Sequence, residues 1–216
     1  MIQKEILPLF SKVFCKQILE SITDENLKTI QSFIEKLEYR KTGLIYKTVG
    51  ETTENNASIS NSLKVLESPE LKFLKDILTY ESKMFLQDYM KYDQCDFTIS
   101  TSWISKTNKN ETSHFHNHNN SFYSGIFYVD TNSDSGNIMF ENFENKTFKI
   151  NTKEKHIFNC TSYTFVPENK MLLLFPSEVH HKILDSFSNT RYSLAFNILP
   201  KGTIGESDSK IVIGDQ

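Results

Sequence analysis

The sequence lacks the features that mark several large classes of protein. Its 216 residues include only three cysteines, widely spaced and odd in number, which excludes a disulfide framework and favours a reducing compartment. No apolar run approaches the roughly 20 residues that span a bilayer, and the N-terminus has no pattern typical of a secretory signal. Basic residues do not outnumber acidic ones, and the net charge is -3, which disfavours nucleic acid as a partner. We therefore expect a cytoplasmic protein with no membrane segment.

The composition supports a folded domain. Apolar residues make up 38% of the chain and charged residues 24%, which is enough to bury a core and to stay in solution. The chain contains no internal repeat and no convincing linker, so the sequence predicts one domain over residues 1–216. We divide it into a mainly helical part (1–95), a strand-rich core (96–200) and a C-terminal tail (201–216).

Two helices are predicted in the first part. The first follows Asp24, a residue type that caps helices, and its apolar stripe consists of Leu27, Ile30, Ile34 and Leu37. The second begins at Ser68-Pro69-Glu70, and its stripe consists of Leu71, Leu74, Ile77, Leu78, Phe85 and Tyr89. The polar stretch between them, from Gly50 to Ser62, is predicted to be a surface loop. This helical part is also a candidate surface for homodimerisation.

From about Asp96 the pattern changes to short runs rich in aromatic and β-branched residues, divided by Asn, Asp, Ser and Gly. The predicted strands are 97–105, 122–129, 158–166, 171–175 and 191–199. Helices followed only by strands indicate an α+β chain built on an antiparallel double sheet, either a sandwich or a barrel.

Five of the six histidines form two clusters: His114, His116 and His118, and then His180 and His181. In an extended segment, residues i and i+2 point to the same side, so an H-x-H pair can direct two imidazoles to one metal ion. A third ligand from the second cluster would complete a site. Imidazole suits both zinc and iron, and the spacing does not choose between them or between His180 and His181. The alternative is that these histidines lie in solvent near turns.

The last predicted strand alternates strictly between polar and apolar positions. Tyr192, Leu194, Phe196 and Ile198 share one face, and Arg191, Ser193, Ala195 and Asn197 share the other. If the apolar face packs on a second layer, Arg191 is buried and needs an anion. A guanidinium with a nearby hydroxyl can bind a carboxylate at two points. The alternative is an edge strand with Arg191 in solvent.

Four segments carry a resemblance to a known family. They are, in chain order, Ser102-Trp103-Ile104, His116-x-His118-x-x-Ser121-x-x-Ser124-Gly125-x-x-Tyr128-Val129, Phe175-Pro176-Ser177-x-x-x-His181 and Arg191-x-Ser193-x-x-Phe196-Asn197. This set resembles the 2-oxoglutarate and iron(II)-dependent oxygenases common in phages and marine bacteria, distant relatives of the prolyl hydroxylases. The resemblance implies a double-stranded β-helix, a jelly-roll barrel with N-terminal helices packed on it.

The resemblance also implies roles for individual residues. It assigns the metal to His116, His118 and His181, and not to His180, because three residues separate Phe-Pro-Ser from the family's distal histidine. Arg191, with Ser193 beside it, would bind the distal carboxylate of 2-oxoglutarate, and Tyr128 would line the same pocket. The implied activity is hydroxylation of a C–H bond with Fe(II), 2-oxoglutarate and dioxygen, releasing succinate and carbon dioxide. The primary substrate, a small molecule or a protein, is not indicated.

One departure from the wider superfamily leaves alternatives open. Its usual triad has two histidines and one carboxylate, whereas this sequence has His118 at the carboxylate position. Either the site has three histidines, or a carboxylate such as Asp130 or Glu141 joins it. Two rival functions are a metal-binding jelly roll without turnover and a cupin-type three-histidine dioxygenase that does not use 2-oxoglutarate. Neither rival requires Arg191.

Overall fold

A large antiparallel sheet is the centre of the fold in the computed structural model, which describes residues 10–42, 56–92, 95–132, 134–142, 150–154, 156–187 and 190–214. Its strands are, in spatial order, β1 (Cys15–Ile18), β8 (Met171–Pro176), β5 (Tyr123–Asp130), β10 (Arg191–Ile204), β4 (Asp96–Thr107), β3 (Ser58–Ser60) and β2 (Tyr39–Lys41), with β11 (Ile211–Ile213) paired to β10. A smaller sheet consists of β7 (Ser162–Phe165), β6 (Ile138–Glu141) and β9 (His180–Ile183). The two sheets form the double-stranded β-helix that the sequence analysis expected.

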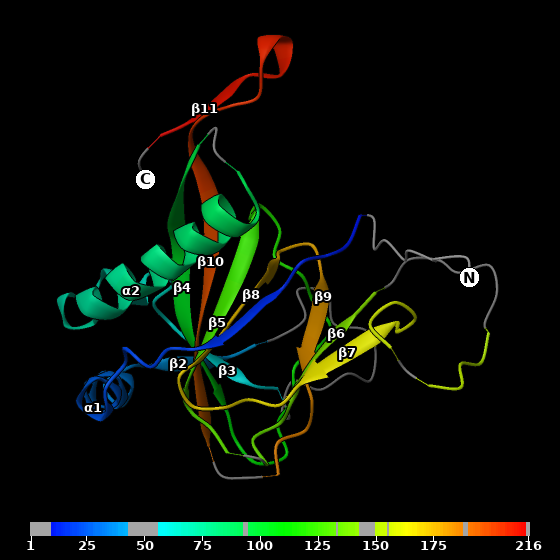
Figure 1. Cartoon of the computed structure of the whole chain (residues 1–216). Coiled ribbons are helices and arrows are strands. Elements are labelled where there is room, and N and C mark those ends of the chain that lie inside the picture. The colour runs from blue at the N-terminus through cyan, green and yellow to red at the C-terminus, as the bar shows by residue number, and fades with distance from the viewer. Residues whose placement is uncertain are drawn as a thin grey trace.

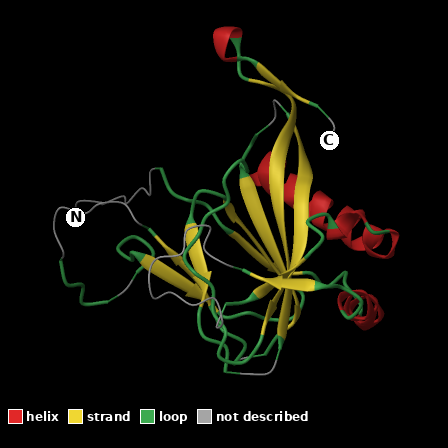
Figure 2. Cartoon of the chain, turned by 180° about the vertical axis from the view of Figure 1, so that it is seen from behind, coloured by secondary structure: helices red, strands yellow, loops and turns green. Residues whose placement is uncertain are grey.

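Helices and the small sheet lie on opposite sides of the large sheet (Figure 1). The helical elements are α1 (Asp24–Ile34), α2 (Lys72–Lys83), the 3-10 turns η1 (Val65–Glu67), η2 (Pro69–Leu71) and η4 (Ser207–Ser209), and the π-helical turn η3 (Met84–Tyr89). Seen from behind, α1 and α2 again lie on one side of the sheet and the small sheet on the other (Figure 2). No helix in the described ranges is long and apolar enough to cross a membrane.

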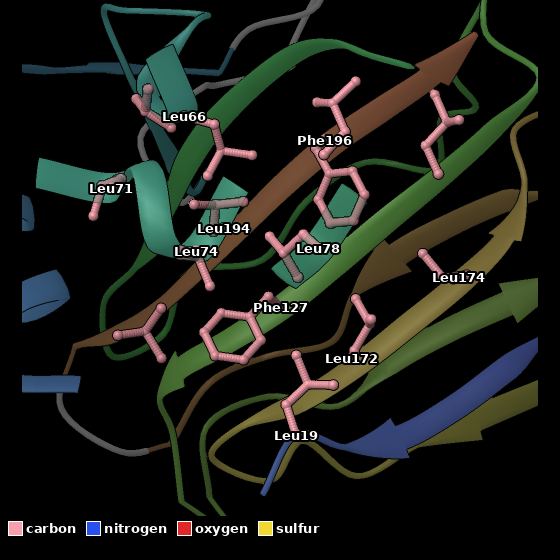
Figure 3. Packing of buried hydrophobic residues seen from close by; sticks show 14 of the residues in the cluster. Leu19, Leu66, Leu71, Leu74, Leu78, Phe127, Leu172, Leu174, Leu194 and Phe196 are labelled. Atoms are coloured by element: carbon pink, nitrogen blue, oxygen red, sulfur yellow. The ribbon is translucent and has the colours of Figure 1, made fainter. Parts of the chain in front are cut away.

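Alternation along the strands divides the core into two layers. Leu194 and Phe196 of β10 face the helices, where they pack with Leu74, Leu78 and Phe127 (Figure 3). Each fully buried side chain of this kind contributes roughly 1.5–3 kcal/mol. The opposite face of β10 is turned toward the small sheet, where Ala195 packs in a second apolar layer. The side chains that could carry chemistry therefore lie between the two sheets.

The first helix begins one residue earlier than expected. Thr23, and not Asp24, is the N-cap, because its Oγ1 accepts the Asn26 N–H at 3.1 Å while Asn26 Oδ1 accepts the Thr23 N–H at 3.0 Å. This reciprocal pair is a capping box with asparagine in the third position. Asp24 lies in the first turn, where its negative charge interacts favourably with the positive end of the helix dipole.

The second helix departs from its predicted stripe near its end. Leu71, Leu74, Leu78 and Phe85 are buried, but Tyr89 is 78% exposed. The π-helical turn η3 explains the difference, because its i→i+5 hydrogen bonds break the 3.6-residue period on which the prediction depends. The expectation for Tyr89 was therefore wrong.

Several strands were not predicted. Besides its helices, the N-terminal part contains three strands, β1, β2 and β3, that belong to the large sheet. The expected loop from Gly50 to Ser62 is wrong at Ser58–Ser60, which pairs with β4, while residues 50–55 lie outside the described residues. The predicted tail begins inside β10, which runs to Ile204 and pairs with β11 over its last three residues. These short strands exist because distant partners hold them, which local sequence does not reveal.

Gly125 tests the packing between β5 and β10. It pairs with Phe196, and a Cβ at this position would lie 2.1 Å from the Phe196 ring, which is fully buried. Because that ring has no room to move, we expect Gly125→Ala to lower the free energy of unfolding by about 1–3 kcal/mol. The measurement is urea unfolding. Gly214→Ala is the control, because a Cβ there would have no atom of the described residues within 4 Å, its own chain neighbours aside. Equal stability of the two variants would contradict the packing described.

Candidate active site

Backbone hydrogen bonds bring the two histidine clusters together. The segment before β5 runs antiparallel to β9, and His116 and His181 exchange both of their N–H···O bonds, at 3.0 and 2.9 Å. Two residues later, the His118 N–H donates to the Ser177 carbonyl at 2.9 Å. The H-x-H segment is thus attached along the start of β9.

Three imidazoles converge as a result. His116, His118 and His181 each offer one ring nitrogen, and these atoms all lie within 4.8 Å of one another. Among the described residues, no carboxylate belongs to this group, so neither Asp130 nor Glu141 joins it. The structure therefore places together the three histidines that the resemblance selected.

The other two histidines lie outside this group. His180 pairs with Glu141 across the β6–β9 ladder, one position out of phase with His181, so its side chain points to the opposite face. His114 is exposed, and its backbone carbonyl accepts a hydrogen bond from the His116 ring.

Each of the three imidazoles is held through Nδ1. His116 Nδ1 lies 2.9 Å from the His114 carbonyl, and His181 Nδ1 lies 3.1 Å from the Val179 carbonyl. His118 Nδ1 lies 2.6 Å from the side-chain oxygen of Asn197. Because carbonyl oxygens only accept, these contacts assign the proton to Nδ1. The three Nε2 atoms are then left with lone pairs, as metal ligation requires.

The local environment favours the neutral form of His118 and His181. Burial lowers the pKa of His118 to about 4, against the opposing effect of its hydrogen bond to Asn197. Burial, followed by the neighbouring His116 and His118, lowers the pKa of His181 well below its ordinary value. At neutral pH both imidazoles are therefore neutral, and their Nε2 lone pairs can bind a cation.

Aromatic rings pack against two of the three imidazoles, those of His118 and His181, while His116 is exposed. The Trp103 ring centroid lies 5.5 Å from that of His118, and the rings of Phe140 and Phe175 lie 5.4 and 4.9 Å from His181. These apolar surfaces lower the local dielectric constant around His118 and His181.

A second polar feature of the interior is Arg191, which is only 1% exposed. Strand β10 lies between β5 and β4 in the sheet, so the alternative of an exposed edge strand is wrong. The guanidinium carbon lies 5.0 Å from the centroid of the Tyr128 ring, and Ser193, also buried, follows on the same face of β10. This arrangement places Arg191, Ser193 and Tyr128 in the same region of the barrel interior.

The Arg191 pocket is polar but incompletely paired. Within the described part of the chain, Nε and Nη1 of Arg191 have no hydrogen-bond partner, nor do the hydroxyls of Tyr128 and of Thr107, the cross-strand partner of Arg191. Burial lowers the pKa of Arg191 and raises that of Tyr128. A buried cation with unused donors fits a carboxylate, which accepts a two-point hydrogen bond from arginine.

A groove of about 810 Å³ begins beside the histidine cluster. Its walls include Val179 and His180, which flank His181 in the chain, and Phe140, which packs near the His181 ring. Phe14 adds further aromatic surface. The sequence analysis did not predict this groove, because it is built from segments that are far apart in the chain.

Comparison with known proteins agrees with the geometry. Residues 101–197 match the model of a family described as "Putative 2OG-Fe(II) oxygenase". Residues 101–197 belong to the 2OG-Fe(II) oxygenases. The matched range includes all three clustered histidines and Arg191, and Fe(II) and 2-oxoglutarate are accordingly the metal and cosubstrate of this oxygenase. No curated protein matches the chain.

Solved structures share the fold of the oxygenase at low sequence identity. An oxidoreductase of the 2OG-Fe(II) oxygenase family from Burkholderia pseudomallei is similar with a TM-score of 0.62 and 12% identity, over 86% of this chain and 84% of that one. A prolyl hydroxylase from Trichoplax adhaerens, in complex with a peptide of hypoxia inducible factor, gives 0.61 and 13%, over 86% and 83%. HygX from Streptomyces hygroscopicus, with nickel, 2-oxoglutarate and hygromycin B bound, gives 0.58 and 10%, over 88% and 83%.

The unused donors of Arg191 lead to a prediction about stability. We expect Arg191→Met to raise the free energy of unfolding of the ligand-free oxygenase by about 1–3 kcal/mol, because it removes Nε and Nη1, buried donors for which the described residues offer no partner. Chemical denaturation in the absence of 2-oxoglutarate measures the effect. Arg40→Met is the matched control, since the Arg40 guanidinium donates to the carbonyls of Ser60 and Asn61 and its removal should not stabilise. A loss of more than about 2 kcal/mol for Arg191→Met would show that its nitrogens are satisfied.

Proposed function

We propose that this oxygenase hydroxylates a C–H bond of a substrate still to be identified, in the cytoplasm, with dioxygen as its second cosubstrate. When bound, iron(II) supplies the oxidising chemistry, with 2-oxoglutarate converted to succinate and carbon dioxide. The single observation that carries the proposal is the buried Arg191, whose Nε and Nη1 have no hydrogen-bond partner among the described residues, in the same barrel as the three convergent imidazoles. A metal alone would explain the histidines but would not require this arginine.

In this proposal the Nε2 atoms of His116, His118 and His181 hold the iron. Their Nδ1 atoms are occupied by carbonyl oxygens, which fixes the ring orientations before a metal arrives. Three neutral ligands leave the charge of the ion uncompensated, and this favours a dianionic cosubstrate. The bound ion and Arg191 would thus be two separate positive charges facing 2-oxoglutarate.

Arg191 would pair with the distal carboxylate of 2-oxoglutarate, and the hydroxyls of Ser193 and Tyr128 would line its binding pocket. Because Arg191 is fully buried, its pairing with a carboxylate is little weakened by water. The guanidinium would orient the cosubstrate and exclude water from it, and it takes no part in proton transfer.

The groove beside His181 is the surface that we propose for the substrate. It is lined by aromatic and apolar side chains such as Phe14 and Phe165 and by polar ones such as Glu141 and Glu178, and its volume could accept a group larger than the cosubstrate. The two rival functions, a zinc-binding jelly roll without turnover and a cupin-type dioxygenase, leave Arg191 without a role, and for that reason we favour the 2-oxoglutarate-dependent reaction.

The ligand assignment predicts which histidines matter for the metal. Alanine at His116, His118 or His181 should sharply lower the bound iron or manganese, because each substitution removes one of three ligands. His114→Ala and His180→Ala are the matched controls and should retain the metal. The His114 variant keeps the backbone carbonyl that accepts from the His116 ring. Elemental analysis after anaerobic loading measures the content. Loss of metal in His180→Ala with retention in His181→Ala would reverse the assignment.

The cosubstrate assignment predicts a separate effect at Arg191. Losing one partner of a buried charge pair costs about 2–5 kcal/mol, and about 1.4 kcal/mol corresponds to tenfold in affinity, so Arg191→Ala should weaken 2-oxoglutarate by more than tenfold. Arg191→Lys should be intermediate, since it keeps the charge and loses the fork. The test is anaerobic titration of 2-oxoglutarate into the manganese-loaded protein. The metal content of the variants should equal that of the wild type, because Arg191 is not a ligand. Equal affinity of wild type and Arg191→Ala would remove the support for a 2-oxoglutarate site.

A further inference from the structure

His118 is held differently from the other two imidazoles. His116 and His181 bond to backbone carbonyls only two residues away. His118 Nδ1 instead lies 2.6 Å from Asn197 Oδ1 and 2.9 Å from Ser124 Oγ. Asn197 is 79 positions further along the chain, so the orientation of this one ring depends on tertiary structure.

Strand pairing builds the support for His118. Asn197 of β10 is the cross-strand partner of Ser124 on β5 and of Thr101 on β4. The three side chains therefore form a row across the inner face of the large sheet. The pairing of β10 with β4 shifts directly after Asn197, and a β-bulge of this kind is a common device for directing a side chain next to a site.

The neighbours of Asn197 fix which way its amide points. Its Nδ2 donates to Thr101 Oγ1 at 2.9 Å, so Oδ1 is the atom that faces His118. Ser124 Oγ lies 3.0 Å from the same Oδ1. An amide oxygen cannot donate, so the proton of the His118 ring must be on Nδ1. The reverse orientation of the amide would present an NH₂ group and favour the opposite tautomer.

We propose that Asn197 is a positioning residue, which holds His118 in the Nδ1–H tautomer and directs its Nε2 to the metal, and that Thr101 orients the Asn197 amide. This inference rests on the proposed function, because it takes His118 to be a ligand. The amide gives the neutral third ligand a fixed direction, in the position that a carboxylate occupies in the usual triad of the wider superfamily. Removing a hydrogen-bond partner of this kind typically lowers metal affinity by about 10–100-fold.

The test compares three variants of the full chain. Asn197→Leu removes the acceptor and should weaken cobalt(II) or manganese(II) binding by about 10–100-fold, with a changed cobalt absorption spectrum. Asn197→Asp retains an acceptor oxygen and should restore both the affinity and the spectrum. Thr101→Val should give a smaller loss, because the amide can then turn. Ser100→Ala is the control, since the Ser100 hydroxyl contacts the backbone oxygen of Asn197 and not its amide.

The outcomes distinguish failure of His118 as a metal ligand from failure of Asn197 as its positioning residue. Thermal unfolding of each metal-free variant shows whether it is folded, and Asn197→Asp and Thr101→Val keep the test open if Asn197→Leu does not fold. If His118→Ala retains the metal, the proposed function fails. If His118→Ala loses the metal while Asn197→Leu and Thr101→Val bind cobalt with wild-type affinity and spectrum, only the positioning role is overturned. Failure of Asn197→Asp to restore binding would also contradict it.

Discussion

The inner face of β10 is the constraint on which the rest of the site depends. At alternate positions it carries Arg191, Ser193, Ala195 and Asn197, and its outer face is apolar and packs under the helices. A shift of one residue in its pairing would turn the arginine and the amide into the helical layer. The cosubstrate pocket and the orientation of His118 are therefore properties of one strand and its register.

The barrel contains two features that a ligand would complete. Three imidazoles lie close together, and among the described residues two nitrogens of the buried Arg191 have no hydrogen-bond partner. The arginine does not stabilise the ligand-free fold, since buried polar groups without partners cost free energy. The chemistries of the two features are complementary to one molecule, because a metal ion accepts the imidazole lone pairs and a carboxylate accepts the guanidinium protons. Such a cost is expected where a fold is adapted to binding and not to stability.

The sequence alone predicted those features that depend on local periodicity. Alternation assigned both faces of β10, and the i, i+2 spacing of His116 and His118 indicated a shared direction. The choice of His181 over His180 came from resemblance, and the pairing with β9 agrees with it. What the sequence could not supply was contact between distant segments. Asn197 was placed on the correct face but given no role, and strands β1–β3 were missed because short strands depend on the partners that pair with them.

The central claim is that three neutral imidazoles and one buried arginine form a single binding site. A crystal structure of the protein loaded anaerobically with manganese(II) and 2-oxoglutarate tests it most directly. We expect the Nε2 atoms of His116, His118 and His181 on the metal, no protein carboxylate among the ligands, and the distal carboxylate of 2-oxoglutarate paired with Arg191. A carboxylate ligand from the protein, coordination through Nδ1, or 2-oxoglutarate bound away from Arg191 would contradict the account.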